Sequence, residues 1–233
     1  MPKINITDFS KDNKCLVFGI GMGSVERCRE KQLEQIMKDC KDDQNALFVE
    51  LGVYKGETIN ICAKKKRNRV FWGFDSFLGL ERNWHFSDER VYEVGVDWNI
   101  KDKEYEMAEA VFEDNVEVVE GWFKDTLPDW VASRWPKQYI SFLHVDCDEY
   151  GAVFESLMIL NKLIKPGTII RFDELTSWHL HFANTQTHHV LNTYERWEQG
   201  EFKALNDWLT KKRRKVRPLL RDVHQSGTVI VEK

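Results

Sequence analysis

The sequence lacks any apolar run long enough to cross a bilayer, which takes about 20 residues in a helix. Its early apolar stretch, 16–22, is short and is followed by charged residues rather than by a small-residue cleavage site, so we expect no secretory signal. An excess of positive charge is also missing, because the net charge is -4 and the isoelectric point is near 6.0. We therefore expect neither a nucleic acid nor a membrane as a partner.

Cysteine is scarce and follows no motif. The cysteines number five, which is odd, and their spacings match no pattern of metal ligands. These observations argue against a disulfide framework and against a zinc-binding fold, and they favour a reducing, cytoplasmic location. The residues are Cys15, Cys28, Cys40, Cys62 and Cys147.

Internal repeats and low-complexity tracts are absent as well, and short apolar runs instead alternate with amphipathic segments. This alternation predicts an α/β fold with a doubly wound, mainly parallel, Rossmann-like sheet of seven strands that ends in an antiparallel hairpin. The expected parallel strands are 46–51, 70–74, 116–119, 139–145 and 168–172, and the hairpin strands are 215–223 and 228–231.

The amphipathic segments predict helices at 25–41, 57–66, 128–135, 152–164, 186–197 and 201–212. The first is an N-terminal helical segment ahead of the sheet, and the basic clusters 64–67 and 211–215 are interpreted as solvated helix ends. The chain length favours a single domain over residues 1–233. A long, charged insertion at about 81–115 contains aromatic residues such as Trp84 and Trp98, and we interpret it as a lid.

A glycine-containing turn follows the expected strand 46–51. Glu50, Gly52 and Gly56 lead into a helix, and the next strand ends at Asp75, about 20 residues beyond the second glycine. Glycines let a ligand approach the backbone, a helix N-terminus offers free N–H groups, and a carboxylate at this spacing suits a ribose diol. The glycines alone would also fit a tight turn with Asp75 as a cap, but the combination favours a nucleoside cofactor.

The spacing of the glycines distinguishes between two such cofactors. NAD sites usually show G-x-G-x-x-G, whereas this segment reads G-x-x-x-G, so we favour S-adenosylmethionine (SAM). The other glycine-rich segment, 19–23, precedes the series of strong strands and is interpreted as a loop.

Acidic residues end two neighbouring strands. Asp146 and Asp148 follow the run 139–145, and Asp173 and Glu174 follow the run 168–172. Four carboxylates at one sheet edge are costly unless a cation or protons neutralise them, so we predict a hard divalent ion such as Mg²⁺. Acids at strand ends also cap helices, and a D-x-D pair is typical of metal-dependent glycosyltransferases, so these interpretations stay open.

Histidines gather beyond the second acidic pair, but we interpret them as surface residues or as residues behind the metal ligands. His144 lies within an expected strand and is interpreted as a core residue with satisfied hydrogen bonds. The gathered histidines are His179, His181, His188 and His189.

Several motifs resemble the macrocin-type O-methyltransferases, which are class I SAM-dependent enzymes that act on sugar hydroxyls of natural products. The matching motifs occur in the same order through most of the chain, at 49–56, 73–80, 121–128, 144–148 and 200–204. This resemblance implies a class I methyltransferase fold, SAM and Mg²⁺ as cofactors, and a small-molecule acceptor whose hydroxyl group belongs to a saccharide.

The resemblance also implies roles for individual residues. Asp148 would be the general base, and Asp146, Asp173 and Glu174 would be the metal ligands. The residues that bind SAM would be Glu50, Gly52, Tyr54, Gly56, Thr58, Asp75, Ser76, Gly121 and Trp122, with the last two beside the adenine.

The sequence departs from the family pattern at Glu174, where a second aspartate is usual, and at Glu81, where a proline is usual. Arg171 falls in a strand that we expect to be buried, so it needs an acidic partner. Two other functions stay open, namely a metal-dependent glycosyltransferase and a non-catalytic nucleotide-binding module. The sequence identifies no particular acceptor, and a homo-oligomer is compatible with it.

Overall fold

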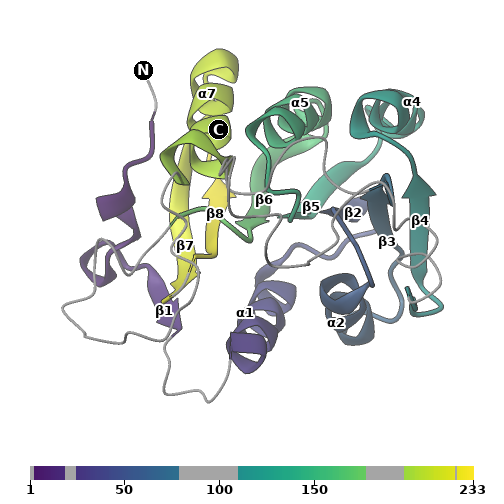
Figure 1. Cartoon of the computed structure of the whole chain (residues 1–233), viewed down its shortest axis with the longest axis horizontal. Helices are drawn as coiled ribbons and strands as arrows, with labels where there is room; N and C mark the ends of the chain where they lie inside the picture. Colours follow the sequence, from purple (N-terminus) through teal and green to yellow (C-terminus); the bar gives the residue numbers. More distant parts are fainter. Residues whose placement is uncertain (1–2, 19–24, 79–109, 177–196, 224) are drawn as a thin grey trace, which may run out of the picture.

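The structure, a computed structural model, describes residues 3–18, 25–78, 110–176, 197–223 and 225–233. Its centre is an eight-stranded sheet with the strand order β1-β7-β8-β6-β5-β2-β3-β4 (Figure 1). Strand β8 is antiparallel to β6 and β7, and the other neighbouring strands are parallel. The fold is therefore the doubly wound, mainly parallel α/β fold that the sequence predicts.

All seven predicted strands are present, and the sheet has one more. The additional strand, β1, has three residues and pairs with β7 at one edge of the sheet. An apolar run this short does not distinguish a strand from a loop, so the sequence predicts one strand too few. The strands are β1 (Leu16–Phe18), β2 (Ala46–Leu51), β3 (Phe71–Asp75), β4 (Val116–Glu120), β5 (Tyr139–Val145), β6 (Ile164–Phe172), β7 (Val216–Asp222) and β8 (Gly227–Val231).

Helices cover both faces of the sheet, α1 and α2 on one face and α4, α5 and α7 on the other (Figure 1). Each face has its own apolar core: Leu33 and Ile59 belong to the first, and Leu157 and Trp208 belong to the second. Strand β2 between them is buried along its whole length, as expected for a parallel strand covered on both sides. The helices are α1 (Val25–Asp39), α2 (Glu57–Lys65), α4 (Phe123–Arg134), α5 (Tyr150–Leu160) and α7 (Glu201–Lys212), with 3₁₀ helices at Ile6–Phe9, Lys11–Asn13 and Trp197–Gln199.

Two predicted boundaries are wrong. Helix α4 begins at Phe123 rather than at Pro128, which lies inside the helix although proline favours a first turn. Helix α5 ends at Leu160, residues 161–163 form a turn, and Ile164 opens β6, where it pairs with Ile140 of β5. Local sequence does not show this pairing, since it depends on a neighbouring strand.

Several predictions concern residues outside the described ranges. These are the loop 19–23, most of the expected lid at 81–115, the helix 186–197 apart from its last residue, and the histidines His179, His181, His188 and His189. The described end of the lid segment packs on α2, where the Asn115 side chain donates to the carbonyl oxygens of Ala63, Lys66 and Arg69.

Other expectations from composition can be compared with the structure. All five cysteines are buried and free, which agrees with the absence of a disulfide framework. The basic clusters lie at the last turns of α2 and α7, as predicted. Within the described part of the chain, no helix combines the length and the apolar character that a bilayer crossing requires.

The strand order indicates which edge of the sheet is suited to bind a ligand. After β2 the chain adds β3 and β4 on one side, and it then returns to place β5 on the other side of β2. Open α/β sheets bind ligands beyond the carboxyl ends of the strands at such a reversal of strand order. The residues that follow β2, β3, β5 and β6 are those that the sequence singles out.

Candidate functional site

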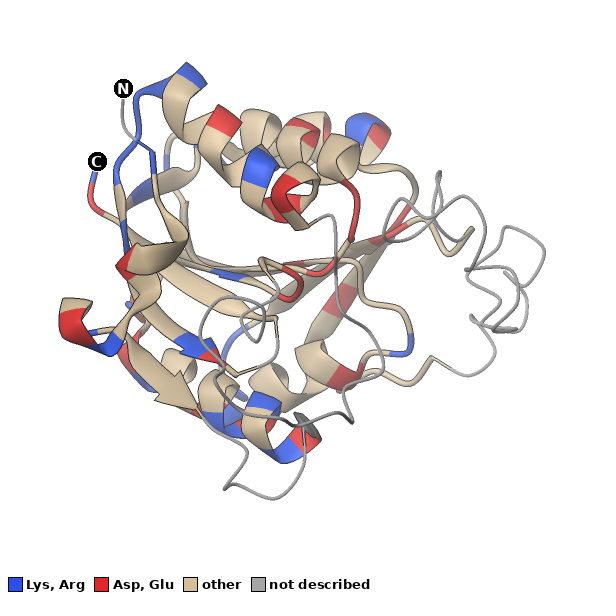
Figure 2. Ribbon diagram, turned by 60° about the vertical axis from the view of Figure 1, so that its left-hand side comes forward, with Lys and Arg blue, Asp and Glu red and all other residues tan. Residues whose placement is uncertain are grey.

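A cavity of about 950 Å³ lies at this carboxyl edge. It is lined by loops that follow strands β2 to β6 and by the start of helix α5, and acidic ribbon segments gather there (Figure 2). All the predicted site residues line it except Glu50 and Gly56. The predicted residues that line it are Gly52, Tyr54, Thr58, Asp75, Ser76, Gly121, Trp122, Asp146, Asp148, Asp173 and Glu174.

Gly52 lies where the loop after β2 approaches the loop after β5. Its φ of 81° is in the left-handed region, and its N–H donates to the carbonyl oxygen of Phe74 at 2.8 Å. A Cβ atom on Gly52 would lie 1.8 Å from the carbonyl oxygen of Asp146. Only glycine fits this close approach of two backbones.

Asp75 at the end of β3 holds the same loop. Its Oδ2 accepts hydrogen bonds from the backbone N–H groups of Val53 (2.9 Å) and Tyr54 (3.0 Å), and its Oδ1 accepts from Phe77 (2.8 Å). Asp75 therefore fixes the backbone of the glycine loop and also lines the cavity. These backbone contacts are not predicted by the spacing, and the ribose contact stays a prediction.

The loop after β4 continues the wall of the cavity. The N–H of Gly121 donates to the carbonyl oxygen of Asp75 at 2.8 Å, and Trp122 precedes α4 as its N-cap. The Ser76 hydroxyl accepts a hydrogen bond from the N–H of Leu78 at 3.1 Å. These contacts place Ser76, Gly121 and Trp122, which follow β3 and β4, in the wall of the cavity.

Glu50 and Gly56 lie beside the cavity rather than on its surface. Glu50 is 2% exposed, its Oε1 accepts from the Thr58 hydroxyl at 2.6 Å, and its Oε2 lies 3.0 Å from Nδ1 of His144. Gly56 has a φ of 87° and packs against the ring of Phe112. Both residues support the loop after β2 without lining the cavity. The motif alone does not show this.

The acids after β5 and β6 reach one place because the strand ladder continues into their backbones. The N–H of Asp146 donates to the carbonyl oxygen of Leu51 at 2.9 Å, and that of Asp173 donates to Val145 at 3.0 Å. Asp148 has a φ of 61°, a left-handed conformation that aspartate tolerates better than most residues. The predicted gathering of strand-end acids is therefore present.

Burial and mutual repulsion raise the pKa values of three acids at this edge. Burial first, and then the charge of Asp173, raises the pKa of Asp146 well above its usual value. Burial and the charge of Asp148 do the same to the pKa values of Glu174 and Glu201. Burial and repulsion between neighbouring carboxylates therefore oppose the ionisation of Asp146, Glu174 and Glu201.

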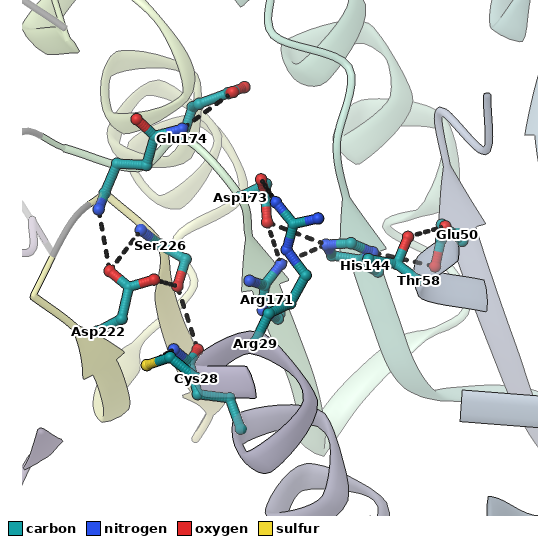
Figure 3. Close-up of polar contacts among 12 residues, drawn as sticks. Cys28, Arg29, Glu50, Thr58, His144, Arg171, Asp173, Glu174, Asp222 and Ser226 are labelled. Atoms are coloured by element: carbon teal, nitrogen blue, oxygen red, sulfur yellow. Dashed lines mark hydrogen bonds and ion pairs between the residues drawn. The ribbon is translucent and has the colours of Figure 1, made fainter. Parts of the chain in front are cut away.

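Asp173 differs because two arginines contact it. Nη1 of Arg171 lies 2.5 Å from its Oδ1, and Nη2 of Arg29 lies 3.4 Å from its Oδ2 (Figure 3). Burial raises the pKa of Asp173, but the two guanidinium groups outweigh it and hold that pKa well below the usual value. Asp173 is thus the acidic partner that buried Arg171 requires.

The donor atoms fit a hard divalent cation. Oxygens of Asp146 and Asp173 and a ring nitrogen of His144 lie within 4.8 Å of one another. Glu174, the third predicted ligand, is not part of this group: its Oε1 accepts from Gln225, and its buried Oε2 has no hydrogen-bond partner in the described part of the chain. Carboxylate oxygens suit Mg²⁺, whereas His144 is already engaged by Glu50 and Arg171.

Three residues at the site are not singled out by the sequence. Arg29 comes from α1, Gln225 from the turn between β7 and β8, and Glu201 from the start of α7. Gln225 donates to Oε1 of Glu174 at 3.1 Å, and Glu201 accepts from the N–H of Glu174 at 3.0 Å. Only Glu201 carries a sequence signal, because it lies in the motif 200–204.

Comparison with known proteins gives one family and several solved structures. A family model described as Macrocin-O-methyltransferase (TylF) matches residues 15–195. A search of curated proteins found no match. The apo structure of CalS11, a TDP-rhamnose 3'-O-methyltransferase of calicheamicin biosynthesis, is 18% identical with a TM-score of 0.57, covering 97% of this chain and 87% of that chain.

Two further solved structures share the fold. The O-methyltransferase NovP is 18% identical with a TM-score of 0.54, covering 88% of this chain and 80% of that chain. The methyltransferase MycE of mycinamycin biosynthesis, solved with Mg and S-adenosylhomocysteine (SAH), is 13% identical with a TM-score of 0.50, covering 87% of this chain and 49% of that chain. At these identities, the structures establish a common fold.

Proposed function

The chain belongs to the macrocin O-methyltransferase family, and from this premise we propose that it transfers the methyl group of SAM to a hydroxyl group of a saccharide-bearing small molecule with the help of a divalent cation. The saccharide acceptor is supported by the family, the macrocin O-methyltransferases, and by the similarity to CalS11, which is a TDP-rhamnose 3'-O-methyltransferase. The cation is supported by the acid-rich edge of the cavity and by the Mg in the MycE structure.

One observation carries the proposal. A single cavity is lined both by the glycine loop with Asp75 and by the acids after β5 and β6. The first group suits a nucleoside, and the second suits a cation and a proton-accepting carboxylate. A methyl donor and a hydroxyl acceptor must meet within one space, and this cavity offers a place for each.

The proposed chemistry assigns separate tasks to the residues. When bound, SAM supplies an electrophilic methyl group, and a divalent cation supplies positive charge that favours the alkoxide form of a hydroxyl. Asp146, Asp173 and Glu174 would hold the cation. Asp148 would accept the proton of the acceptor hydroxyl, because a sugar hydroxyl is a poor nucleophile until it loses that proton.

The proposal can be tested by calorimetry and by methyl transfer. We expect titration with SAH to show binding and titration with a nucleotide-sugar to show none. Labelled SAM, screened against hydroxyl-bearing glycosides, is expected to label at least one acceptor. We expect EDTA to reduce that labelling about 100-fold and Mg²⁺ to restore it, because stabilisation of charge by a metal is worth several kcal/mol.

Two other outcomes point to a different function, and a third contradicts only the role of the cation. Binding of the nucleotide-sugar without binding of SAH would favour a glycosyltransferase. Binding of SAH with no labelled acceptor, with or without metal, would favour a non-catalytic module. Labelling that EDTA leaves unchanged would contradict the role of the cation and leave the methyltransferase assignment intact.

A further inference from the structure

Three buried polar residues form a row across neighbouring strands beneath the cavity. The strand register pairs Glu50 of β2 with His144 of β5, and His144 with Arg171 of β6. Paired residues point to the same face of a sheet, and the three side chains lie side by side in Figure 3. Their exposures are 2%, 0% and 1%, so water does not screen the row.

The row joins two walls of the cavity through successive contacts. At one end, Thr58 of α2 donates to Glu50 at 2.6 Å, and Glu50 lies 3.0 Å from Nδ1 of His144. At the other end, Nη1 of Arg171 lies 2.5 Å from Nε2 of His144 and 2.5 Å from Oδ1 of Asp173. Both terminal residues, Thr58 and Asp173, line the cavity.

The chemistry of the guanidinium group fixes the direction of these contacts. A guanidinium group only donates hydrogen bonds, so the contact between Nη1 of Arg171 and Nε2 of His144 is a hydrogen bond when Nε2 carries no proton, and the ring proton is then on Nδ1, 3.0 Å from Oε2 of Glu50. Two hydrogens of one Arg171 nitrogen are thereby directed at His144 and Asp173. The contact with His144 fixes the plane of the Arg171 guanidinium group. The guanidinium group in turn orients the Asp173 carboxylate.

A contribution to the stability of the fold does not by itself explain why these three polar residues are buried side by side. Buried ion pairs are often no more stabilising than apolar side chains of the same volume. Residues behind metal ligands, however, commonly orient them, and replacing those residues lowers metal affinity about 10- to 100-fold. The row ends at Asp173, where a carboxylate of the acid-rich edge must face the cavity.

We propose that Arg171, held in place by His144, is a positioning residue that orients the Asp173 carboxylate toward the divalent cation. This inference rests on the proposed function, which supplies the cation. Arg171 itself is buried below the cavity wall and is not among the residues that line the cavity. It acts through Asp173 and not by contact with a substrate.

Charge and geometry make opposite contributions at this position, so the test must separate them. Removing a positive charge near a cation site would strengthen metal binding, whereas losing the orientation of Asp173 would weaken it. Lysine keeps the charge of Arg171 but lacks the planar fork of a guanidinium. The variant Arg171→Lys therefore changes the geometry while the charge stays constant.

The test measures Mn²⁺ affinity by electron paramagnetic resonance in the presence of saturating SAH. We expect Arg171→Lys to bind Mn²⁺ about 10- to 100-fold more weakly than the unsubstituted protein, with SAH affinity unchanged. His144→Gln removes the ring that contacts the guanidinium and adds no negative charge, so we expect a loss in the same direction. If Arg171→Lys does not fold, His144→Gln decides the question.

Arg214→Lys is the matched control. Arg214 also donates to partly buried acceptors, the side chain and carbonyl of Asn161 and the carbonyl of Ile164, but it does not line the cavity. We expect its replacement to lower the melting temperature and to leave Mn²⁺ affinity unchanged. An equal loss of Mn²⁺ affinity in this control would overturn the proposal, because the loss would then be a general effect of destabilisation.

The remaining outcomes separate this inference from the proposed function. Unchanged Mn²⁺ affinity in both Arg171→Lys and His144→Gln would overturn the positioning role alone. An unsubstituted protein that binds SAH but not Mn²⁺ would contradict the proposed cation and, with it, the role of Arg171.

Discussion

Asp148→Asn is expected to lower kcat for methyl transfer about 10²- to 10⁴-fold, the range that general-base catalysis usually provides. Asparagine has the same shape but cannot accept the proton of the acceptor hydroxyl at neutral pH. It also tolerates the left-handed backbone at this position, where φ is 61°, so the loop after β5 is expected to keep its conformation. SAH affinity should therefore stay unchanged.

The measurement is single-turnover methyl transfer at saturating SAM and Mg²⁺, which separates the chemical step from binding. Asp129→Asn serves as the control, because Asp129 is exposed on α4 and does not line the cavity. A rate for Asp148→Asn equal to that of the control would remove Asp148 from the role of base.

Gly52→Ala is expected to weaken SAH binding by up to about 100-fold. The added Cβ would lie 1.8 Å from the carbonyl oxygen of Asp146, so the backbones after β2 and β5 would have to move apart. The positive φ adds strain of about 1–3 kcal/mol, and overpacking adds a similar amount. If half of this total, about 1–3 kcal/mol, falls on the cofactor loop, SAH affinity drops about 5- to 100-fold.

The control for Gly52→Ala is Gly167→Ala, which carries the same kind of backbone strain. Gly167 has a φ of 95°, but a Cβ there meets only the flexible end of Lys41, and the residue is remote from the cavity lining. We expect lower stability with normal SAH binding. Calorimetry checks both variants, and normal SAH affinity in Gly52→Ala would contradict the placement of the cofactor beside this glycine.

The sequence predicts the main strands and the acid-rich edge because both depend on local patterns. Strands buried on both faces read as continuous apolar runs, as in β2 and β5, and the polar residues after them must lie at the carboxyl edge. The glycine loop is recognisable because its spacing is local as well. Most predicted site residues therefore line one cavity.

The parts that the sequence does not predict depend on contacts between distant segments. Glu50 precedes the last residue of β2, and the alternation along a strand turns its side chain into the row below the cavity instead of onto the surface. Arg29 reaches Asp173 from 144 positions away in the chain. No local pattern reports such a contact, nor the approach of Gln225 to Glu174.

A crystal structure with SAH and Mn²⁺ bound, with the ion located by its anomalous scattering, tests the central claim most directly. The account predicts SAH along the glycine loop, Asp75 and Trp122, and an Mn²⁺ peak in contact with the carboxylates of Asp146, Asp173 and Glu174 in the same cavity. Fully bound SAH with no Mn²⁺ peak at these acids, or SAH bound elsewhere on the protein, would contradict it.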